Sequence, residues 1–247
     1  MRQEARTRYF GTAALLVVIA AVAVLAASGV PASAATSIIA NTGPYSGGYG
    51  GGEFIETVVH WDFAGKPITW ITPGNPLGVA PAQTFSTFCA QEDQYFYPGY
   101  TYTVEKLALV TNNGGGKPLT DKAAFLFHMW NSGALPDYDY SNASGGRSAD
   151  ATDLQRVLWS YFVQPNGDIS GGKRAEWDTL ATNAIGHSWT GFGGVRVMQL
   201  IGNSGGVDTP NAQDHLVEIT PEPATLALVA IGALPLLPIV RRRRTVV

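Results

Sequence analysis

The sequence lacks several features that mark large classes of protein. It contains one cysteine in 247 residues, which excludes an intramolecular disulfide framework and a multi-cysteine zinc site. Only 14% of its residues are charged and 45% are hydrophobic, a balance that excludes wholesale disorder. Long apolar runs occur only at the two ends, so the chain is not a polytopic membrane protein. The length allows one domain, or two small ones, at about 100–200 residues per domain.

Residues 1–34 have the order of a secretory signal peptide. Three arginines precede an apolar run over residues 13–27, and the small residues Ala32-Ser33-Ala34 follow it. This order predicts cleavage by a signal peptidase after Ala34 or Ala35. The alternative, an uncleaved anchor helix, leaves the small-residue site unexplained. We therefore expect the protein to leave the cytoplasm.

Residues 220–247 have a second three-part order. A Pro-Glu-Pro motif opens it, a 17-residue apolar run over residues 224–240 follows, and four arginines close it. The run is near the lower limit of about 17–25 residues for a transmembrane helix, and the arginines are expected on the cytoplasmic side. The residues of this motif are Pro221, Glu222, Pro223, Arg241, Arg242, Arg243 and Arg244.

The tail resembles the PEP-CTERM sorting signal of Gram-negative bacteria, because Thr220-Pro-Glu-Pro-Ala-Thr-Leu-Ala-Leu is close to its consensus. The resemblance implies recognition by an exosortase while the C-terminal helix anchors the chain transiently in the inner membrane. It further implies removal of the tail and delivery to the cell surface or the extracellular matrix. It covers the tail alone and does not say what the body does.

The body between the two ends is acidic. Residues 35–221 hold nine Lys and Arg against seventeen Asp and Glu, which gives a net charge of −8. The basic residues are scattered, with only Lys173 and Arg174 adjacent, so nucleic-acid binding is not expected. This charge is more naturally a solubility feature of an exported protein.

The pattern of the body predicts an α+β fold: a β-rich sandwich or barrel-like body with an inserted helical part, in one extracellular domain over residues 35–219. Signal and sorting helices are expected to flank this domain. Alternation predicts strands over residues 53–61, 84–90, 100–110, 195–201 and 215–219, after a glycine-rich loop over 43–52. Helical periodicity predicts helices over residues 121–131, from a cap at Ser148 or Thr152 to 163, and over 173–185. Thr120 is expected to cap the first, and Gly133 and Gly186 to end the first and third.

Cys89 and Gln155 are the residues of greatest chemical interest. Gln155 shares a helical stripe with Ala151, Leu158 and Phe162, so it is expected near the buried face. An unpaired buried amide costs about 1–3 kcal/mol, and an unpaired cysteine in an exported protein needs an explanation. Attack of the thiolate on the glutamine carbonyl, with loss of ammonia, would leave an internal thioester and explain both residues. The alternative is structural, because cysteine packs well as a small hydrophobe and the amide can bond to the backbone.

Two short motifs resemble the thioester domains of bacterial surface adhesins. They are Phe88-Cys89 and Leu154-Gln155-Arg156-Val157-Leu158-Trp159, in which Val-Leu replaces the Ala-Ile of the family. Many PEP-CTERM proteins share a similar layout, with Gly51-Gly52-Glu53-Phe54 before the cysteine and Gln213-Asp214-x-Leu216-Val217 before the tail. The resemblance implies a surface adhesin that attaches covalently to amines, hydroxyls or polysaccharide. It does not prove that Cys89 and Gln155 touch.

The remaining motifs are weaker, and we expect no turnover enzyme, cofactor or metal site. The loop around Ser204 is like that of a serine protease, but no matching histidine motif surrounds His60. Asp137 and Asp139 begin like a calcium loop and then depart from its pattern, which favours a solvated acidic loop over weak calcium binding. Four tyrosines could stack on sugars or pack across strands: Tyr95, Tyr97, Tyr100 and Tyr102. The second candidate function is therefore a passive structural or carbohydrate-binding matrix module.

Overall fold

The structure is a computed structural model that describes residues 36–46, 51–60, 84–112, 115–141, 145–202 and 212–219. The predicted signal peptide over 1–34, the sorting signal over 220–247 and the Ser204 loop lie outside the described residues. No helix among the described residues is long and apolar enough to cross a membrane. The described residues belong to a single compact unit.

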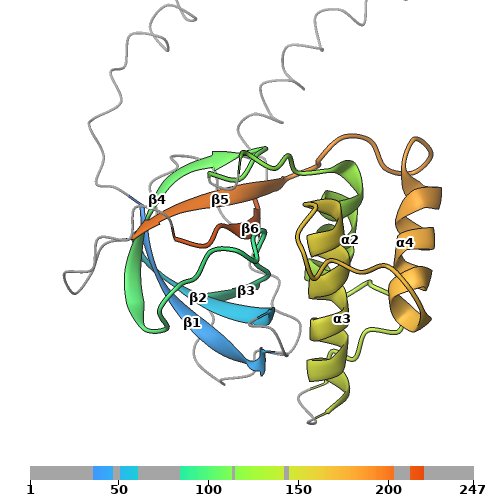
Figure 1. The fold of residues 1–247 in the computed structure, drawn as a ribbon, viewed down its shortest axis with the longest axis horizontal. Coiled ribbons are helices and arrows are strands. Elements are labelled where there is room, and N and C mark those ends of the chain that lie inside the picture. The colour runs from blue at the N-terminus through green and yellow to red at the C-terminus, as the bar shows by residue number, and fades with distance from the viewer. Residues whose placement is uncertain are drawn as a thin grey trace, which may run out of the picture. The chain divides into compact units, whose positions relative to one another are not determined.

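Six antiparallel strands form one sheet that curls into a half-barrel (Figure 1). Their order across the sheet is β3-β2-β1-β4-β5-β6. The strands are β1 (Ser37–Ser46), β2 (Gly52–His60), β3 (Thr84–Thr87), β4 (Tyr100–Ala108), β5 (Val195–Gly202) and β6 (His215–Glu218). The expected α+β class with a β-rich body is confirmed, and the body is a single curled sheet rather than two stacked sheets.

Strand β1 is absent from the sequence-based prediction, and its last residues fall in the segment predicted as a loop. Gly43 and the proline after it suggested a turn, whereas β1 passes through them and pairs with β2 up to Ser46 and Gly52. The pairing register shifts between Thr42 and Ser46, which accommodates these residues. A Cβ at Gly43 would lie 2.2 Å from the carbonyl oxygen of Glu53, so this close strand contact requires glycine.

Three helices of the described chain lie between β4 and β5, as the predicted helical insertion requires. They are α2 (Asp121–Asn131), α3 (Gly146–Tyr161) and α4 (Gly172–Ala184). The α2 bounds and cap are as predicted, since Thr120 accepts the N–H of Ala123 at 3.2 Å. The predicted cap of α3 is wrong: the helix begins at Gly146, and Thr152 donates its hydroxyl to the Ser148 carbonyl inside the helix.

The helices cover one side of the curled sheet (Figure 1). Buried apolar residues pack on both faces of the sheet, in two separate clusters. Strand β6 shows the alternation, because Leu216 packs in the helix-side core and Val217 packs inside the curl. Strand β2 alternates in the same way: Phe54 and Glu56 share the interior face, and Glu53 is on the opposite, helix-facing side. The interior of the curl therefore meets the helices at the end where β2 and α3 come together.

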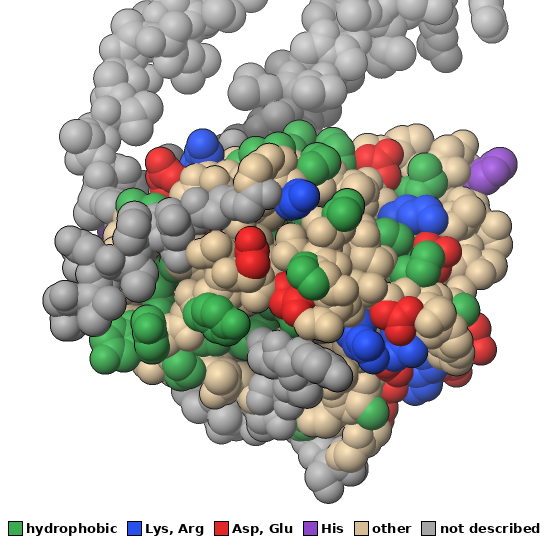
Figure 2. All heavy atoms as spheres, viewed as in Figure 1, with side chains coloured by type: hydrophobic (Ala, Val, Ile, Leu, Met, Phe, Trp, Pro, Cys, Tyr) green, Lys and Arg blue, Asp and Glu red, His purple; other side chains and the backbone are tan. Residues whose placement is uncertain are grey.

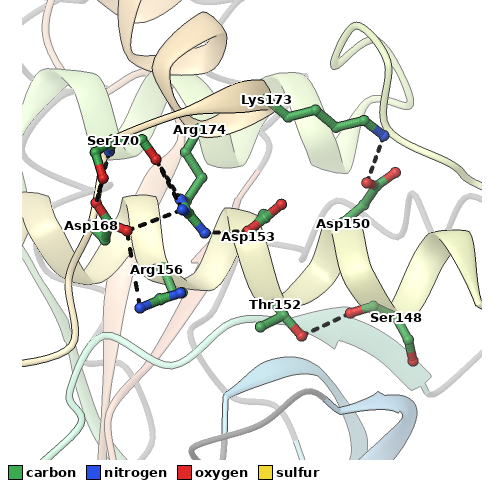
Figure 3. Close-up of polar contacts among 9 residues, drawn as sticks. All are labelled: Ser148, Asp150, Thr152, Asp153, Arg156, Asp168, Ser170, Lys173 and Arg174. Atoms are coloured by element: carbon green, nitrogen blue, oxygen red, sulfur yellow. Dashed lines mark hydrogen bonds and ion pairs between the residues drawn. The ribbon is translucent and has the colours of Figure 1, made fainter.

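Charged side chains join α3 to α4 on the outer surface (Figure 3). Lys173 binds Asp150 at 2.6 Å, and Arg174 binds Asp153 at 2.7 Å and Asp168 at 3.1 Å. Figure 2 shows charges of both signs over the helices and hydrophobic side chains over the sheet. Arg174 and its two partners are partly exposed, and ion pairs of this kind contribute at most about 1 kcal/mol each. Their main effect is to orient α4 along the outer side of α3.

Candidate functional site: a buried cysteine–glutamine pair

The fold brings Cys89 and Gln155 together. Gln155 lies on the buried stripe of α3 and is 1% exposed, because α3 packs against β1 and β2. Cys89 follows the end of β3 and is completely buried. It forms an isolated antiparallel bridge with His215, the first residue of β6, so the two side chains are on the same face. Residues 66 apart in sequence thus form one polar contact inside the protein.

The Gln155 side chain is held by hydrogen bonds at both ends of its amide. Its Oε1 atom accepts from the backbone N–H of Cys89 at 3.2 Å and of Gly52 at 3.4 Å, and lies 3.2 Å from the Cys89 Sγ. Its Nε2 atom donates to the Cys89 carbonyl at 2.8 Å. The thiol therefore lies against a carbonyl group whose oxygen faces two backbone donors. Such donors stabilise the negative charge that develops on the oxygen when a nucleophile attacks the carbonyl carbon.

Two glycines make room for this arrangement. Gly52 has φ of 121°, a conformation that favours glycine, and this places its N–H toward Gln155. A Cβ at Gly51 would lie 2.5 Å from Cγ of Gln155 and 2.9 Å from Cη2 of Trp159. Only glycine therefore fits at residue 51 without displacing the glutamine.

The surroundings of the thiol are aromatic. Cys89 packs with Phe54 and Trp159, and Phe96 lies against the same cluster. Burial raises the pKa of the Cys89 thiol well above its ordinary value, while the indole of Trp159 opposes the rise without forming a hydrogen bond of good geometry. The resting cysteine is consequently a thiol, and it must give up its proton before it can act as a nucleophile.

A second buried pair, which the sequence did not reveal, lies beside the cysteine. His215 and Glu56 are both completely buried, with Nδ1 and Oε1 2.5 Å apart. The imidazole stacks on Phe54 at 5.4 Å between ring centroids and meets Phe96 edge-on at 5.3 Å, so it shares the aromatic surroundings of Cys89. Burial raises the pKa of Glu56, and His215 opposes that rise. The available signals were a glutamate on the apolar face of β2 and the histidine inside the Gln213-Asp214-x-Leu216-Val217 motif.

The residues next to His215 fix the cysteine segment in place. The Asp214 carbonyl accepts the N–H of Ala90 at 2.8 Å, and the Phe88 carbonyl accepts the N–H of Leu216 at 2.9 Å. The Asp214 carboxylate accepts the N–H of Leu200 at 3.1 Å, while burial raises its pKa to about 6. Cys89 is therefore held from both sides by backbone bonds to the segment that carries His215.

The Glu53 carboxylate joins the helical part to the sheet on the other face of β2. Arg147, at the start of α3, donates to both of its oxygens at 2.8 Å, and the Tyr138 hydroxyl donates to Oε1. Arg147 also lies over the ring of Tyr45 at 4.5 Å. This network fixes the first turn of the helix that carries Gln155.

The other candidate residues lie apart from this site. His60 is exposed at the end of β2, and the Ser204 loop is outside the described residues. The Asp137 carbonyl accepts from Lys173 at 2.6 Å, and Asp139 accepts the N–H of Ser141 at 2.8 Å. In the described ranges, no group of three or more His, Cys, Asp or Glu is placed to hold a metal ion. Tyr102 is buried, whereas three tyrosines are 41–77% exposed: Tyr95, Tyr97 and Tyr100.

Comparisons with protein families, with curated proteins and with solved structures found no match to this chain.

Proposed function

We propose that this chain is an exported, exosortase-sorted surface or matrix protein that attaches covalently through an internal Cys89–Gln155 thioester. The attachment partner is an amine or hydroxyl of a surface or polysaccharide. The Pro-Glu-Pro tail and the signal-peptide pattern support the sorting part of this proposal. The body resemblance to adhesin thioester domains supports the attachment part.

One observation carries the chemistry. The Gln155 Oε1 atom lies 3.2 Å from the Cys89 Sγ and faces the two backbone donors of Cys89 and Gly52. The thiol donates a hydrogen bond to Oε1, and the same contact places the sulfur next to the carbonyl group that it would attack. Complete burial of the cysteine would protect the resulting thioester from hydrolysis.

The mass of the intact protein tests the proposal. Formation of the thioester releases ammonia, so the folded full chain should be lighter than its sequence by one ammonia after known processing is subtracted. The variants C89A and Q155A should each have the full mass, because the bond needs both partners. Gln164 provides a matched control, because it is another largely buried glutamine whose amide oxygen accepts a backbone N–H, that of Glu92. Q164A should keep the mass loss.

A small amine tests whether the bond is reactive. Because the pair is buried, we expect methylamine to react before larger nucleophiles, adding at residue 155 and releasing a titratable Cys89 thiol. Peptide mapping distinguishes this adduct from hydrolysis, which would leave glutamate at 155. Unmodified Gln155 together with a free Cys89 in freshly prepared protein would contradict the thioester.

The second candidate function is a carbohydrate-binding matrix module without covalent chemistry. The three exposed tyrosines favour it, because aromatic faces stack on sugars, and Tyr97 and Tyr100 pack edge-to-face at 5.8 Å. A glycan array or a pull-down with purified polysaccharide tests it. Binding that survives C89A and disappears in Y95A/Y97A would support this module over the covalent adhesin.

A further inference from the structure

The thioester proposed above needs a path for one proton, and this inference rests on that proposal. The Cys89 proton must leave the sulfur, and the nitrogen that departs from Gln155 must gain a proton to become ammonia. The raised pKa of the buried thiol makes unassisted ionisation rare at neutral pH. A base beside the sulfur that later returns the proton would satisfy both requirements.

His215 lies beside Cys89, and its Nε2 atom is available to accept a proton. It is the direct partner of Cys89 in their antiparallel bridge, so the two side chains extend from the same face of neighbouring backbone segments. Its Nδ1 is bound to Glu56, while its Nε2 is buried without a hydrogen-bond partner among the described residues. A buried nitrogen left unpaired destabilises the fold, so a structural role alone does not explain it.

Glu56 sets the state of the imidazole. When the carboxylate is ionised, it accepts the Nδ1 proton, and the lone pair is then on Nε2. This is the arrangement of a catalytic triad, in which a carboxylate orients a histidine base and the base activates a nucleophile, here a cysteine. The second oxygen of Glu56 also has no hydrogen-bond partner in the described part of the chain, so the pair is not bound into a wider polar network.

We infer that His215, oriented by Glu56, transfers the proton during formation of the Cys89–Gln155 thioester. Nε2 of His215 takes the proton from Sγ, and Sγ forms a bond to Cδ of Gln155. The oxyanion on Oε1 is held by the N–H groups of Cys89 and Gly52. The C–N bond then breaks, the imidazolium returns its proton to the departing nitrogen, and ammonia leaves. No oxidant, cofactor or net proton is required.

The ionisable groups around this pair come from several elements. Asp214 precedes His215 and interacts electrostatically with it. On β4, burial raises the pKa of Tyr102, and the Glu56 carboxylate raises it further. Glu92 acts on Cys89 in the direction of a higher pKa. From α3, the neighbours of the thiol are Gln155 and Trp159, which do not titrate.

The test follows ammonia loss over time. Full-length protein with intact Gln155 is unfolded in urea and refolded by dilution, and intact mass is recorded at intervals while tryptophan fluorescence follows folding. The variant H215N keeps an amide group near the position of Nδ1 for Glu56 and removes the base. It should lose ammonia about 10²–10⁴-fold more slowly than the wild type. H128N is the matched control, because His128 also binds a glutamate through Nδ1, and it should leave the rate unchanged.

The pH profile separates proton transfer from simple positioning. With His215 present as a base, the reaction proceeds from the thiol, so the rate should rise with pH less steeply than the thiolate fraction. Without it, the rate should rise tenfold per pH unit, in step with the thiolate fraction. E56Q retains the histidine but removes the carboxylate that orients it, so its pH dependence should approach that of H215N. The steepness of the pH dependence in H215N and in E56Q does not depend on small changes in packing.

The outcomes distinguish this inference from the function on which it rests. If the wild type never loses ammonia, the thioester itself is wrong. If the wild type loses ammonia and folded H215N does so at the same rate, the thioester stands and the role of His215 is wrong. If H215N does not fold, the wild-type profile decides, because a full tenfold rise per pH unit, as steep as that of the thiolate fraction, would overturn the inference.

Discussion

Two glutamates three residues apart on β2 have opposite surroundings. Glu53, on the helix side, has hydrogen bonds to both oxygens, from Arg147 and Tyr138. Glu56, inside the curl, has one close partner, His215, and an oxygen without a partner among the described residues. Both are at most 1% exposed, so burial alone does not distinguish them. The difference is in how completely each charge is compensated.

This contrast indicates different roles. A buried carboxylate with a bidentate arginine and a hydroxyl is satisfied, and the arrangement fixes the position of α3. A buried carboxylate and imidazole with one free atom each retain the capacity to exchange a proton. The helix side of β2 thus holds the glutamine in place, whereas its interior side supplies the chemistry.

The largest effect on stability is expected for R147M. The substitution leaves the Glu53 carboxylate buried with Tyr138 as its one remaining side-chain donor among the described residues, and an uncompensated buried charge costs about 3–5 kcal/mol. Urea unfolding followed by tryptophan fluorescence measures this loss. R174M is the matched control, because Arg174 binds partly exposed partners and its removal should cost less than about 1 kcal/mol. Similar losses in the two variants would contradict the structural role of the Glu53 network.

The two regions also differ in how far the sequence predicts them. Thr120 and α2 followed from local rules, because a helix cap and a 3.6-residue period involve only near neighbours. The buried stripe of α3 likewise indicated that Gln155 faces inward. The Glu56–His215 pair joins residues 159 apart, and it depends on the pairing register across the sheet, which no local pattern contains.

Strand β1 and the start of α3 were mispredicted for related reasons. The glycine and proline after Thr42 are ordinarily turn residues, but pairing with β2 before and after them, at Thr42 and at Ser46, keeps them in the strand. Gly145 and Gly146 offer no side-chain cap, so the start of α3 is fixed instead by the tertiary contact of Arg147 with Glu53. The sorting signals stay predictions, since they lie outside the described residues.

The next largest effect is expected for G51A, which acts on the site by steric contact rather than charge. The added methyl would lie 2.5 Å from Cγ of Gln155, so the side chain must move and Oε1 loses its position against the backbone donors. We expect slower ammonia loss and a destabilisation of about 1–3 kcal/mol. G99A is the control: it adds strain at φ of 84° with no neighbour within 4 Å, costs about 1 kcal/mol, and leaves ammonia loss unchanged. An unchanged rate in G51A would show that the position of Oε1 is unimportant.

A smaller effect, visible as a pH dependence, is expected for E56Q. The folded-state pKa of Glu56 is raised above its unfolded value, so its favourable contribution to folding is present below pH 4.5 and is lost as pH rises through the folded pKa. E56Q has no ionisable group at residue 56, so it lacks this pH-dependent loss of stability. The free energy of unfolding of the wild type, relative to E56Q, should therefore fall as pH increases above 4.5. Urea titrations across this range measure the difference, and Asp214, with its pKa of about 6, affects both proteins alike. A constant difference would show that His215 fully compensates the charge of Glu56.

The smallest effect is expected for H128Q, which removes the other histidine–glutamate pair. His128 and Glu218 are 2.6 Å apart, but the histidine side chain is 37% exposed, and Asn131 binds the second oxygen of the glutamate at 2.9 Å. The hydrogen bond to Glu218 raises the pKa of His128, so its stabilisation is fully present below the unfolded pKa of about 6.5 and is lost as pH rises through the folded value. H128Q should therefore cost less than about 1 kcal/mol near pH 5.5 and still less near pH 8.5. Thermal unfolding at the two pH values measures this change. A larger loss at the higher pH, or a slower ammonia loss in H128Q, would mean that the two pairs do not differ in the way that their burial and free atoms indicate.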